Sequence, residues 1–122
     1  MKKPIVLVIE DNSLMIEIFK LTMPFVEIIS AQTKEEGRKI LEKHLDDAFL
    51  VALDACVPGR EANTQDLLKE ILKKNFKGHI VSISGDPIYR EEYLELGCTH
   101  ACNKQNLQAF IRGLLNLPLV LI

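Results

Sequence analysis

The sequence predicts a doubly wound α/β fold, in which helices cover both faces of one parallel sheet. Short apolar runs alternate along the chain with segments whose apolar residues recur at helical spacing, and turn residues separate them. The apolar runs are continuous rather than alternating, as burial on both faces of a sheet requires. Strands that alternate with helices favour parallel pairing and right-handed crossovers.

Five apolar runs are the predicted strands, and each is followed by a predicted helix. The strands are expected at residues 4–10, 26–30, 48–53, 79–84 and 98–102. Four helix faces are expected to pack on the sheet: Leu14, Met15, Ile18 and Phe19; Ile40, Leu41, His44 and Leu45; Leu67, Leu68, Ile71 and Leu72; and Leu107, Phe110, Ile111, Leu114 and Leu115. Helix starts are predicted at Thr33 with Glu36, at Asn63 with Asp66, and at Asp86 before Pro87.

Length and composition favour one cytoplasmic domain spanning residues 1–122. A chain of 122 residues can bury a single core. Its net charge of -2 argues against a nucleic-acid surface, and the lysines at 69, 73, 74 and 77 are interpreted as a solvated helix end. No apolar run approaches the ~20 residues that cross a bilayer. The opening MKKPIVLVIEDN ends in acids rather than in a cleavage site for a signal peptide.

The cysteines do not predict a disulfide framework, because they are three and irregularly spaced. The segment CTHAC places His100 between Cys98 and Cys102, which raises the alternative of a zinc site. That spacing does not match a usual zinc finger and no fourth ligand is evident. Small side chains of a short strand are the preferred interpretation.

Polar residues follow the predicted strands at their carboxyl ends, the edge where doubly wound sheets place their chemistry. They are Glu10 and Asp11 after the first strand, Asp54 after the third, Ser84 and Gly85 at the fourth, and Lys104 after the fifth. Three neighbouring carboxylates need a counter-charge, and oxygen ligands of this kind suit Mg²⁺. A carboxylate such as Asp54 can also act as a nucleophile and form an aspartyl phosphate.

The segments EDN, LDACVPG, SISG and NK together resemble the receiver domain of two-component response regulators, across essentially the whole chain. The resemblance implies a flavodoxin-like strand order 2-1-3-4-5. It implies Mg²⁺ bound by Glu10, Asp11, Asp54 and the backbone carbonyl of Cys56. It also implies that Asp54 is the phosphoacceptor, that Ser84 is the switch hydroxyl and that Lys104 contacts the phosphoryl group.

The family resemblance further implies a phosphoacceptor signalling protein rather than an enzyme. We expect it to be a stand-alone receiver, without an output domain. A histidine kinase or phosphotransfer protein would phosphorylate it, and small donors such as acetyl phosphate would do so as well. Self-dephosphorylation is expected, with the side chains of Cys56 and Asp86 near the path of the attacking water. The output would be protein contact through the face formed by the fourth helix, fifth strand and fifth helix, without nucleic acid or membrane.

The sequence departs from the family pattern around the fifth strand. Gln105 follows Lys104 where the family usually has proline, which questions the cis peptide bond found there. Ala101 stands where the family usually has an aromatic residue that changes rotamer on phosphorylation. The apolar tail at residues 117–122 has no assigned role.

Two other functions remain open at this level. A degenerate receiver would keep the fold as a protein-binding module without phosphorylation. A flavodoxin-like cofactor binder would need a phosphate-cradling loop after the first strand, where this chain has acids instead.

Overall fold

The computed structural model describes residues 2–59 and 61–118, which form five parallel strands and five α-helices. The strands are β1 (Ile5–Ile9), β2 (Glu27–Ala31), β3 (Ala48–Leu53), β4 (His79–Ser82) and β5 (His100–Ala101). The helices are α1 (Ser13–Thr22), α2 (Lys34–His44), α3 (Gln65–Lys73), α4 (Pro87–Leu96) and α5 (Leu107–Leu114). Two short 3₁₀ turns, η1 (Leu45–Asp47) and η2 (Lys104–Asn106), precede β3 and α5.

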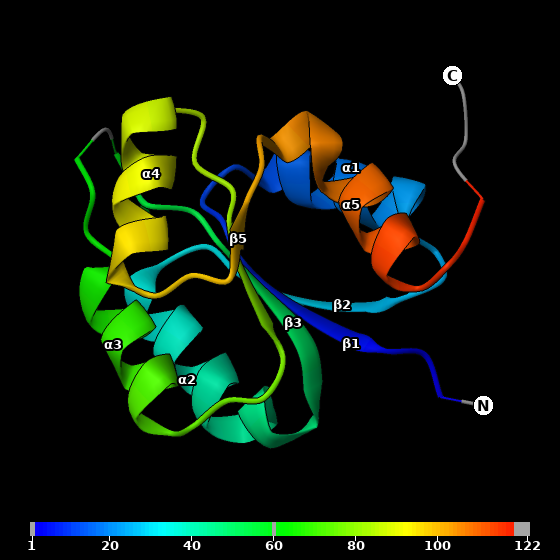
Figure 1. The fold of residues 1–122 in the computed structure, drawn as a ribbon, viewed down its shortest axis with the longest axis horizontal. Coiled ribbons are helices and arrows are strands. Elements are labelled where there is room, and N and C mark those ends of the chain that lie inside the picture. The colour runs from blue at the N-terminus through cyan, green and yellow to red at the C-terminus, as the bar shows by residue number, and fades with distance from the viewer. Residues whose placement is uncertain (1, 60, 119–122) are drawn as a thin grey trace.

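The five strands form one sheet in the order β2-β1-β3-β4-β5, which confirms the predicted doubly wound fold. Helices α1 and α5 cover one face, and α2, α3 and α4 cover the other (Figure 1). All neighbouring strands pair in parallel. Their carboxyl ends therefore meet at one edge of the sheet, where the chain turns into the next helix. None of the described helices is both long and apolar enough to cross a membrane.

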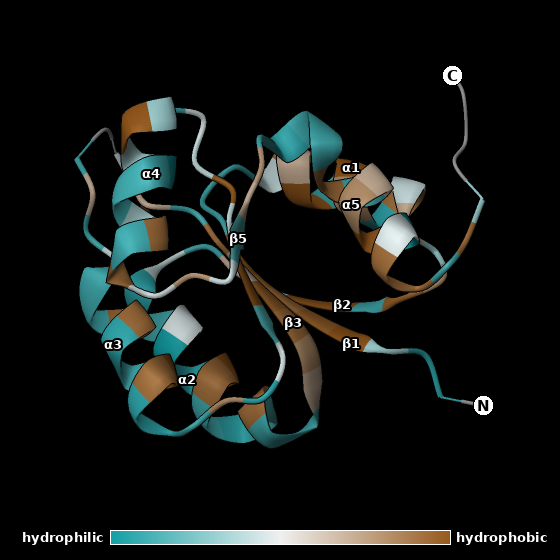
Figure 2. Ribbon diagram, in the orientation of Figure 1, coloured by the Kyte–Doolittle hydropathy of each residue, from teal (hydrophilic) through white to brown (hydrophobic). Residues whose placement is uncertain are grey.

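Each face of the sheet supports its own hydrophobic core, because successive side chains of a strand point to opposite faces. On β1, Val6 and Val8 pack with α1 and α5, whereas Leu7 and Ile9 pack with α2 and α3. All four are fully buried. Figure 2 shows the mainly hydrophobic strands between helices of mixed hydropathy.

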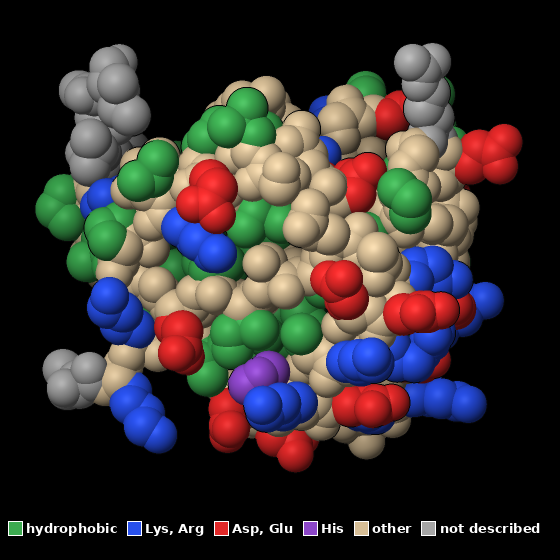
Figure 3. All heavy atoms as spheres, turned by 180° about the vertical axis from the view of Figure 1, so that it is seen from behind, with side chains coloured by type: hydrophobic (Ala, Val, Ile, Leu, Met, Phe, Trp, Pro, Cys, Tyr) green, Lys and Arg blue, Asp and Glu red, His purple; other side chains and the backbone are tan. Residues whose placement is uncertain are grey.

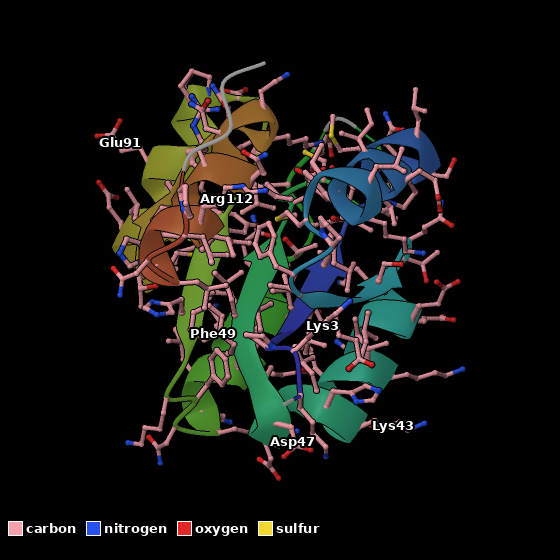
Figure 4. All side chains as sticks on the ribbon, turned by 90° about the vertical axis from the view of Figure 1, so that its right-hand side faces the viewer. Lys3, Lys43, Asp47, Phe49, Glu91 and Arg112 are labelled. Carbon is pink, nitrogen blue, oxygen red and sulfur yellow. The ribbon has the colours of Figure 1, made fainter. Side chains whose placement is uncertain are left out.

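The last two strands are shorter than predicted. β4 ends at Ser82, so Ser84 lies beyond it, and β5 keeps only His100 and Ala101 of the expected residues 98–102. The side chains of this edge strand, one histidine and one alanine, give it little apolar surface to bury. At the β3–β5 end of the sheet, four rings pack in a row: Phe49 on His79 (5.2 Å between centroids), His79 on His100 (5.7 Å) and His100 on Phe110 (4.9 Å). Figure 4 labels Phe49, the second residue of β3, and Asp47, which directly precedes that strand.

The predicted core face of α1 is wrong in part. Leu14 and Ile18 are exposed, at 68% and 40%, whereas Ile16 and Phe19 are buried. The helix is apolar around most of its circumference, so two stripes compete and only tertiary packing selects one. In α3, Leu67, Leu68 and Ile71 are buried as predicted, but Leu72 is 39% exposed.

Two of the three predicted helix starts are confirmed. The side chain of Thr33 accepts a hydrogen bond from the Glu36 N–H (3.1 Å), and that of Asp86 accepts one from the Ile88 N–H (2.8 Å). The third is wrong, because Asn63 does not cap α3. Its amide instead bonds both backbone groups of Val57, as described below.

Charges of both signs cover helices α2 and α3. Asp66 pairs with Lys34 (2.9 Å) and Arg38 (3.2 Å), and Arg38 also pairs with Glu70 (3.2 Å). Figure 3 shows acidic and basic side chains interleaved on the side where these helices lie. This mixture agrees with the interpretation of the neighbouring lysines as a solvated surface.

The chain after α5 turns back onto that helix. The Leu117 N–H donates to the Arg112 carbonyl (2.8 Å), and the Arg112 guanidinium donates to the Pro118 carbonyl (3.1 Å). The same guanidinium lies 4.5 Å from the ring centroid of Phe25, and Figure 4 shows Arg112 on α5. Most of the apolar tail considered above, residues 119–122, lies outside the described residues.

Leu68 and Leu72 provide a matched test of the core face of α3, since both are leucines four residues apart on one helix. Leu68→Ala should lower the free energy of unfolding by about 2–5 kcal/mol, because it leaves a cavity at a fully buried position. Leu72→Ala should cost less than about 1 kcal/mol. Urea unfolding followed by circular dichroism measures both, and equal losses would contradict this assignment of the core.

Candidate functional site

The carboxyl ends of β1, β3 and β4 and the start of η2 surround one cavity of about 340 Å³. Its lining includes most of the residues expected from the sequence. They are Asp11, Asn12, Asp54, Cys56, Gly59, Ser84, Gly85, Asp86, Tyr89 and Lys104. Glu10, directly after β1, lies beneath this set and is fully buried. The parallel strands therefore bring together residues that are up to 94 positions apart in the sequence, from Glu10 to Lys104.

Glu10, Asp11 and Asp54 form a carboxylate cluster, with one oxygen of each within 4.8 Å of the others. The backbone holds them there, because the Glu10 N–H donates to the Ala31 carbonyl (2.9 Å) and the Asp54 N–H to the Ile9 carbonyl (3.0 Å). These bonds extend the β-sheet ladder one residue beyond the strands. Glu10 and Asp54 are buried and Asp11 is half-buried. Three negative charges this close together repel one another, so they are costly without a cation.

The Lys104 ammonium supplies one positive charge. Its Nζ lies 2.5 Å from Glu10 Oε1 and 3.1 Å from Asp54 Oδ2. Burial lowers the pKa of Lys104, but its contacts with Glu10 and Asp54 outweigh that effect and raise it overall. The lysine therefore stays protonated, although only 19% of its side chain is exposed.

Glu10 is the acid of the cluster whose negative charge is least well compensated. Burial is the largest influence and raises its pKa to about 7, while Lys104 and the Asn12 N–H oppose the rise. That N–H donates to Glu10 Oε2 (3.0 Å). The other oxygen, Oε1, contacts Lys104 but has no partner in hydrogen-bond geometry among the described residues. One cation is thus insufficient for this group of acids, and the oxygen set matches the ligands that Mg²⁺ prefers.

Ser84 and Gly85 form the opposite wall of the cavity. Ser84 is almost fully buried, and its Oγ accepts a hydrogen bond from the Asp86 N–H (3.2 Å). Helix α4 fixes the same loop, because the Arg90 guanidinium donates to the Ser84 carbonyl (2.7 Å). A Cβ atom at Gly85 would meet no other atom within 4 Å, so this side of the cavity is open.

Residues without a predicted role at the site shape the loop between β3 and α3. The Asn63 side chain accepts from the Val57 N–H (2.8 Å) and donates to the Val57 carbonyl (2.9 Å), instead of the helix-capping role that the sequence predicts. Thr64 donates to the carbonyl of Asp54 (2.8 Å). Asn12, the last residue of the EDN motif, caps α1 by accepting from the Leu14 and Met15 N–H groups.

Two further expectations concern the possible zinc site at residues 98–102 and the cis peptide bond after Lys104. Cys98, His100 and Cys102 do not form a three-ligand group in the part of the chain that the structure describes, where the carboxylate cluster is the one such group. A cis peptide bond joins Val57 and Pro58, and within the described ranges none follows Lys104.

Comparison with known proteins places the fold. No family model matches the sequence, and no curated protein sequence matches it either. Solved structures do match. A response regulator receiver domain protein from Clostridium thermocellum superposes with a TM-score of 0.74 at 21% identity, over 93% of this chain and 94% of that one.

Two further structures agree with that match. A CheY-like receiver domain protein from Methanospirillum hungatei gives a TM-score of 0.75 at 20% identity, over 94% of this chain and 95% of that one. A putative response regulator from Chloroflexus aurantiacus gives 0.74 at 20% identity, over 94% and 99%. The strand order and the helices on both faces agree with these matches. The chain therefore has the fold of response regulator receiver domains.

Proposed function

We propose that this chain accepts a phosphoryl group on Asp54 in a Mg²⁺-dependent reaction and signals by contact with another protein. The observation that carries the proposal is the cluster of Glu10, Asp11 and Asp54 at one cavity, with Lys104 in contact with two of these acids. The receiver fold is compatible with this chemistry, and the three carboxylates and the lysine are the residues that would perform it.

The acidic cluster suits a Mg²⁺ ion. Glu10, Asp11 and Asp54 would hold it together with the backbone carbonyl of Cys56, which also lines the cavity. Bound Mg²⁺ neutralises charge on the non-bridging oxygens of a phosphoryl group during transfer. The ion would also compensate the second buried carboxylate, which Lys104 alone leaves uncompensated.

Phosphoryl transfer at this site needs mainly positioning and charge compensation. An oxygen of the Asp54 carboxylate attacks the phosphorus of a phosphohistidine or of acetyl phosphate. The new O–P bond forms as the bond to the donor's imidazole nitrogen or acetate oxygen breaks, and the donor leaves with that electron pair. Lys104, already 3.1 Å from Asp54, and the Ser84 hydroxyl contact the transferred oxygens, while Gly85 leaves room for them.

Loss of the phosphoryl group requires a water that attacks phosphorus in line with the bond to Asp54. The side chains of Cys56 and Asp86 line the same cavity on the solvent side and set how easily water enters. Burial and the charge of Asp54 raise the pKa of the Cys56 thiol, so the thiol stays neutral and does not add a negative charge beside the phosphoryl group.

Two exposed apolar surfaces can receive protein partners. Leu14, Ile18 and Leu21 form a stripe along α1 that begins two residues after Asn12, at the rim of the cavity, and suits a phosphodonor protein. On α4, Ile88 is the most exposed apolar residue, at 72%, and this helix belongs to the proposed output face with β5 and α5. A histidine kinase or phosphotransfer protein is the proposed donor.

A degenerate receiver without phosphorylation is the second candidate, favoured by Ala101 at the position of the usual aromatic. It predicts that the acids bind no metal. The cofactor-binder alternative has less support, because acidic Asp11 lies at the cavity where a cofactor phosphate would bind. Absence of flavin absorbance in the purified protein would exclude its flavin form.

Incubation with acetyl phosphate and Mg²⁺ should add one phosphoryl group to the protein, because the nucleophilic oxygen of Asp54 would lie beside two cations, the Lys104 ammonium and the bound Mg²⁺. Asp54→Asn should abolish this gain and keep the fold, since the amide is nearly isosteric but not nucleophilic. Intact mass spectrometry measures both, and circular dichroism confirms the fold. Phosphorylation of the variant would contradict the assignment of Asp54, and no gain in the folded wild-type protein would favour the degenerate receiver.

Mg²⁺ affinity should depend on pH through Glu10, whose pKa of about 7 lies above its ordinary value of 4.5. Mg²⁺ requires the carboxylate, so the apparent dissociation constant should rise roughly tenfold for each pH unit below 7 and level off above it. The raised pKa of Glu10 also makes the stability of the metal-free protein depend on pH. Glu10 favours the metal-free fold below about pH 4.5, and this contribution is lost as pH rises through 7, where bound Mg²⁺ should restore it.

Isothermal titration calorimetry with MgCl₂ at pH 6, 7 and 8 tests this dependence. Glu10→Gln is the matched variant, because it keeps the shape of the side chain but removes its titration. The variant should bind Mg²⁺ more weakly, with a much flatter dependence on pH in this range. An equally steep dependence in the variant would assign the titration to another group.

A further inference from the structure

Two buried hydroxyl groups connect helix α4 to the backbone of Asp54. Thr64 Oγ1 lies 2.8 Å from the Asp54 carbonyl oxygen and 2.7 Å from Tyr93 Oη. Both Thr64 and Tyr93 are fully buried, although neither belongs to the cavity lining. We infer that Tyr93 is a positioning residue, which couples the position of α4 to the loop of the phosphoacceptor through Thr64. We call Tyr93, Thr64 and the Asp54 carbonyl the hydroxyl chain.

The direction of the hydrogen bonds in the hydroxyl chain follows from proton counting. A carbonyl oxygen can only accept a hydrogen bond, so the single hydroxyl proton of Thr64 is donated to the Asp54 carbonyl. The Ala55 carbonyl is farther away, at 3.2 Å. Tyr93 must then donate to Thr64. Burial raises the pKa of Tyr93 to about 12, so the phenol keeps this proton at physiological pH. The Ala55 carbonyl, 3.5 Å from Tyr93 Oη, is at the limit of a hydrogen bond.

The hydroxyl chain contacts a loop whose backbone is also held by hydrogen bonds from Asn63. The Ala55 carbonyl also accepts from the Asn63 N–H (2.8 Å), and the Asn63 side chain bonds both backbone groups of Val57. Cys56, whose carbonyl is the proposed metal ligand, lies between these two fixed points. A small displacement of this segment therefore has to move Thr64, and with it the tyrosine on α4.

Helix α4 is thus held to both loops that flank the cavity. Tyr93 reaches the loop after β3 through Thr64, and Arg90, one turn earlier on the same helix, donates to the Ser84 carbonyl (2.7 Å) in the loop after β4. The relative position of the two loops and the placement of α4 are therefore linked. By reciprocity, a protein that binds and shifts α4 must change the affinity of the cavity for its ligands.

This inference rests on the proposed function for the event that shifts the loop, which is phosphorylation of Asp54. It also supplies a route for the signal that the sequence leaves open. Ala101 in β5 has no ring that can follow the Ser84 hydroxyl, whereas Tyr93 supplies a ring and a hydroxyl from α4.

Hydrogen exchange with mass spectrometry tests the coupling in wild type, Tyr93→Phe, Thr64→Val and Thr64→Ser. Phosphorylation with acetyl phosphate and Mg²⁺ should change the exchange rates of α4 amides in the wild type. Tyr93→Phe and Thr64→Val should reduce that change by about fivefold, the equivalent of one net hydrogen bond. Thr64→Ser keeps the hydroxyl and should respond as the wild type does.

Thr99→Val is the control variant, because Thr99 Oγ1 also donates to a backbone carbonyl, that of Ile80 (3.0 Å), but Thr99 is exposed and lies outside the hydroxyl chain. This variant should keep the α4 response. A full response in Tyr93→Phe and Thr64→Val would overturn the inference.

Intact mass measured on the same samples separates failure of the inference from failure of the proposed function. If the wild type gains no phosphoryl group, the proposed function fails and the unphosphorylated proteins decide the coupling. Tyr93→Phe should then still speed exchange of the amides at residues 55–57, while Thr99→Val should not. Unchanged exchange at those amides would overturn the coupling in that case as well.

Discussion

The contact of the Lys104 ammonium with two buried carboxylates is the interaction on which the site depends. Glu10 and Asp54 lie at the ends of central strands, where they are removed from water, and their mutual repulsion would otherwise favour protonation or local opening. Lys104 comes from the segment after β5, so the last strand must pair correctly before the charges at the first can be compensated. The ion pairs of Lys104 therefore connect the segment after β5, late in the sequence, to the residues that follow β1 and β3.

The fold was predictable because its main determinant is local. Apolar runs identify β1, β2 and β3 nearly to the residue, and β1 and β3 have the continuous apolar sequence that burial on both faces requires. The failures occur where local pattern is ambiguous. On α1, apolar residues surround the helix, so the sequence contains no information on which stripe faces the sheet. In β5, pairing depends on the neighbouring strand more than on its own small residues.

The candidate site was also largely predictable, for a topological reason. Parallel strands end at one edge, so Glu10, Asp54 and Lys104 had to meet once the strands were assigned. The supporting residues were not predictable in the same way. Thr64 and Tyr93 are 29 residues apart and their contact depends on how α4 packs over α3, which no short motif encodes. A buried tyrosine in a helix reads as core until its hydroxyl has a partner.

The side chain of Asn63 has a consequence for how this protein can vary. By bonding the N–H and the carbonyl of Val57, it imitates a neighbouring strand and closes the base of the segment between them. Pro58, Gly59 and Glu61 are exposed beyond that closure. Of these residues only Gly59 lines the cavity, so it has to be kept, whereas substitutions at Pro58 and Glu61 should disturb Asp54 less than changes at Asn63. Glu61 is therefore a natural attachment point for a reporter or a recognition peptide beside the cavity.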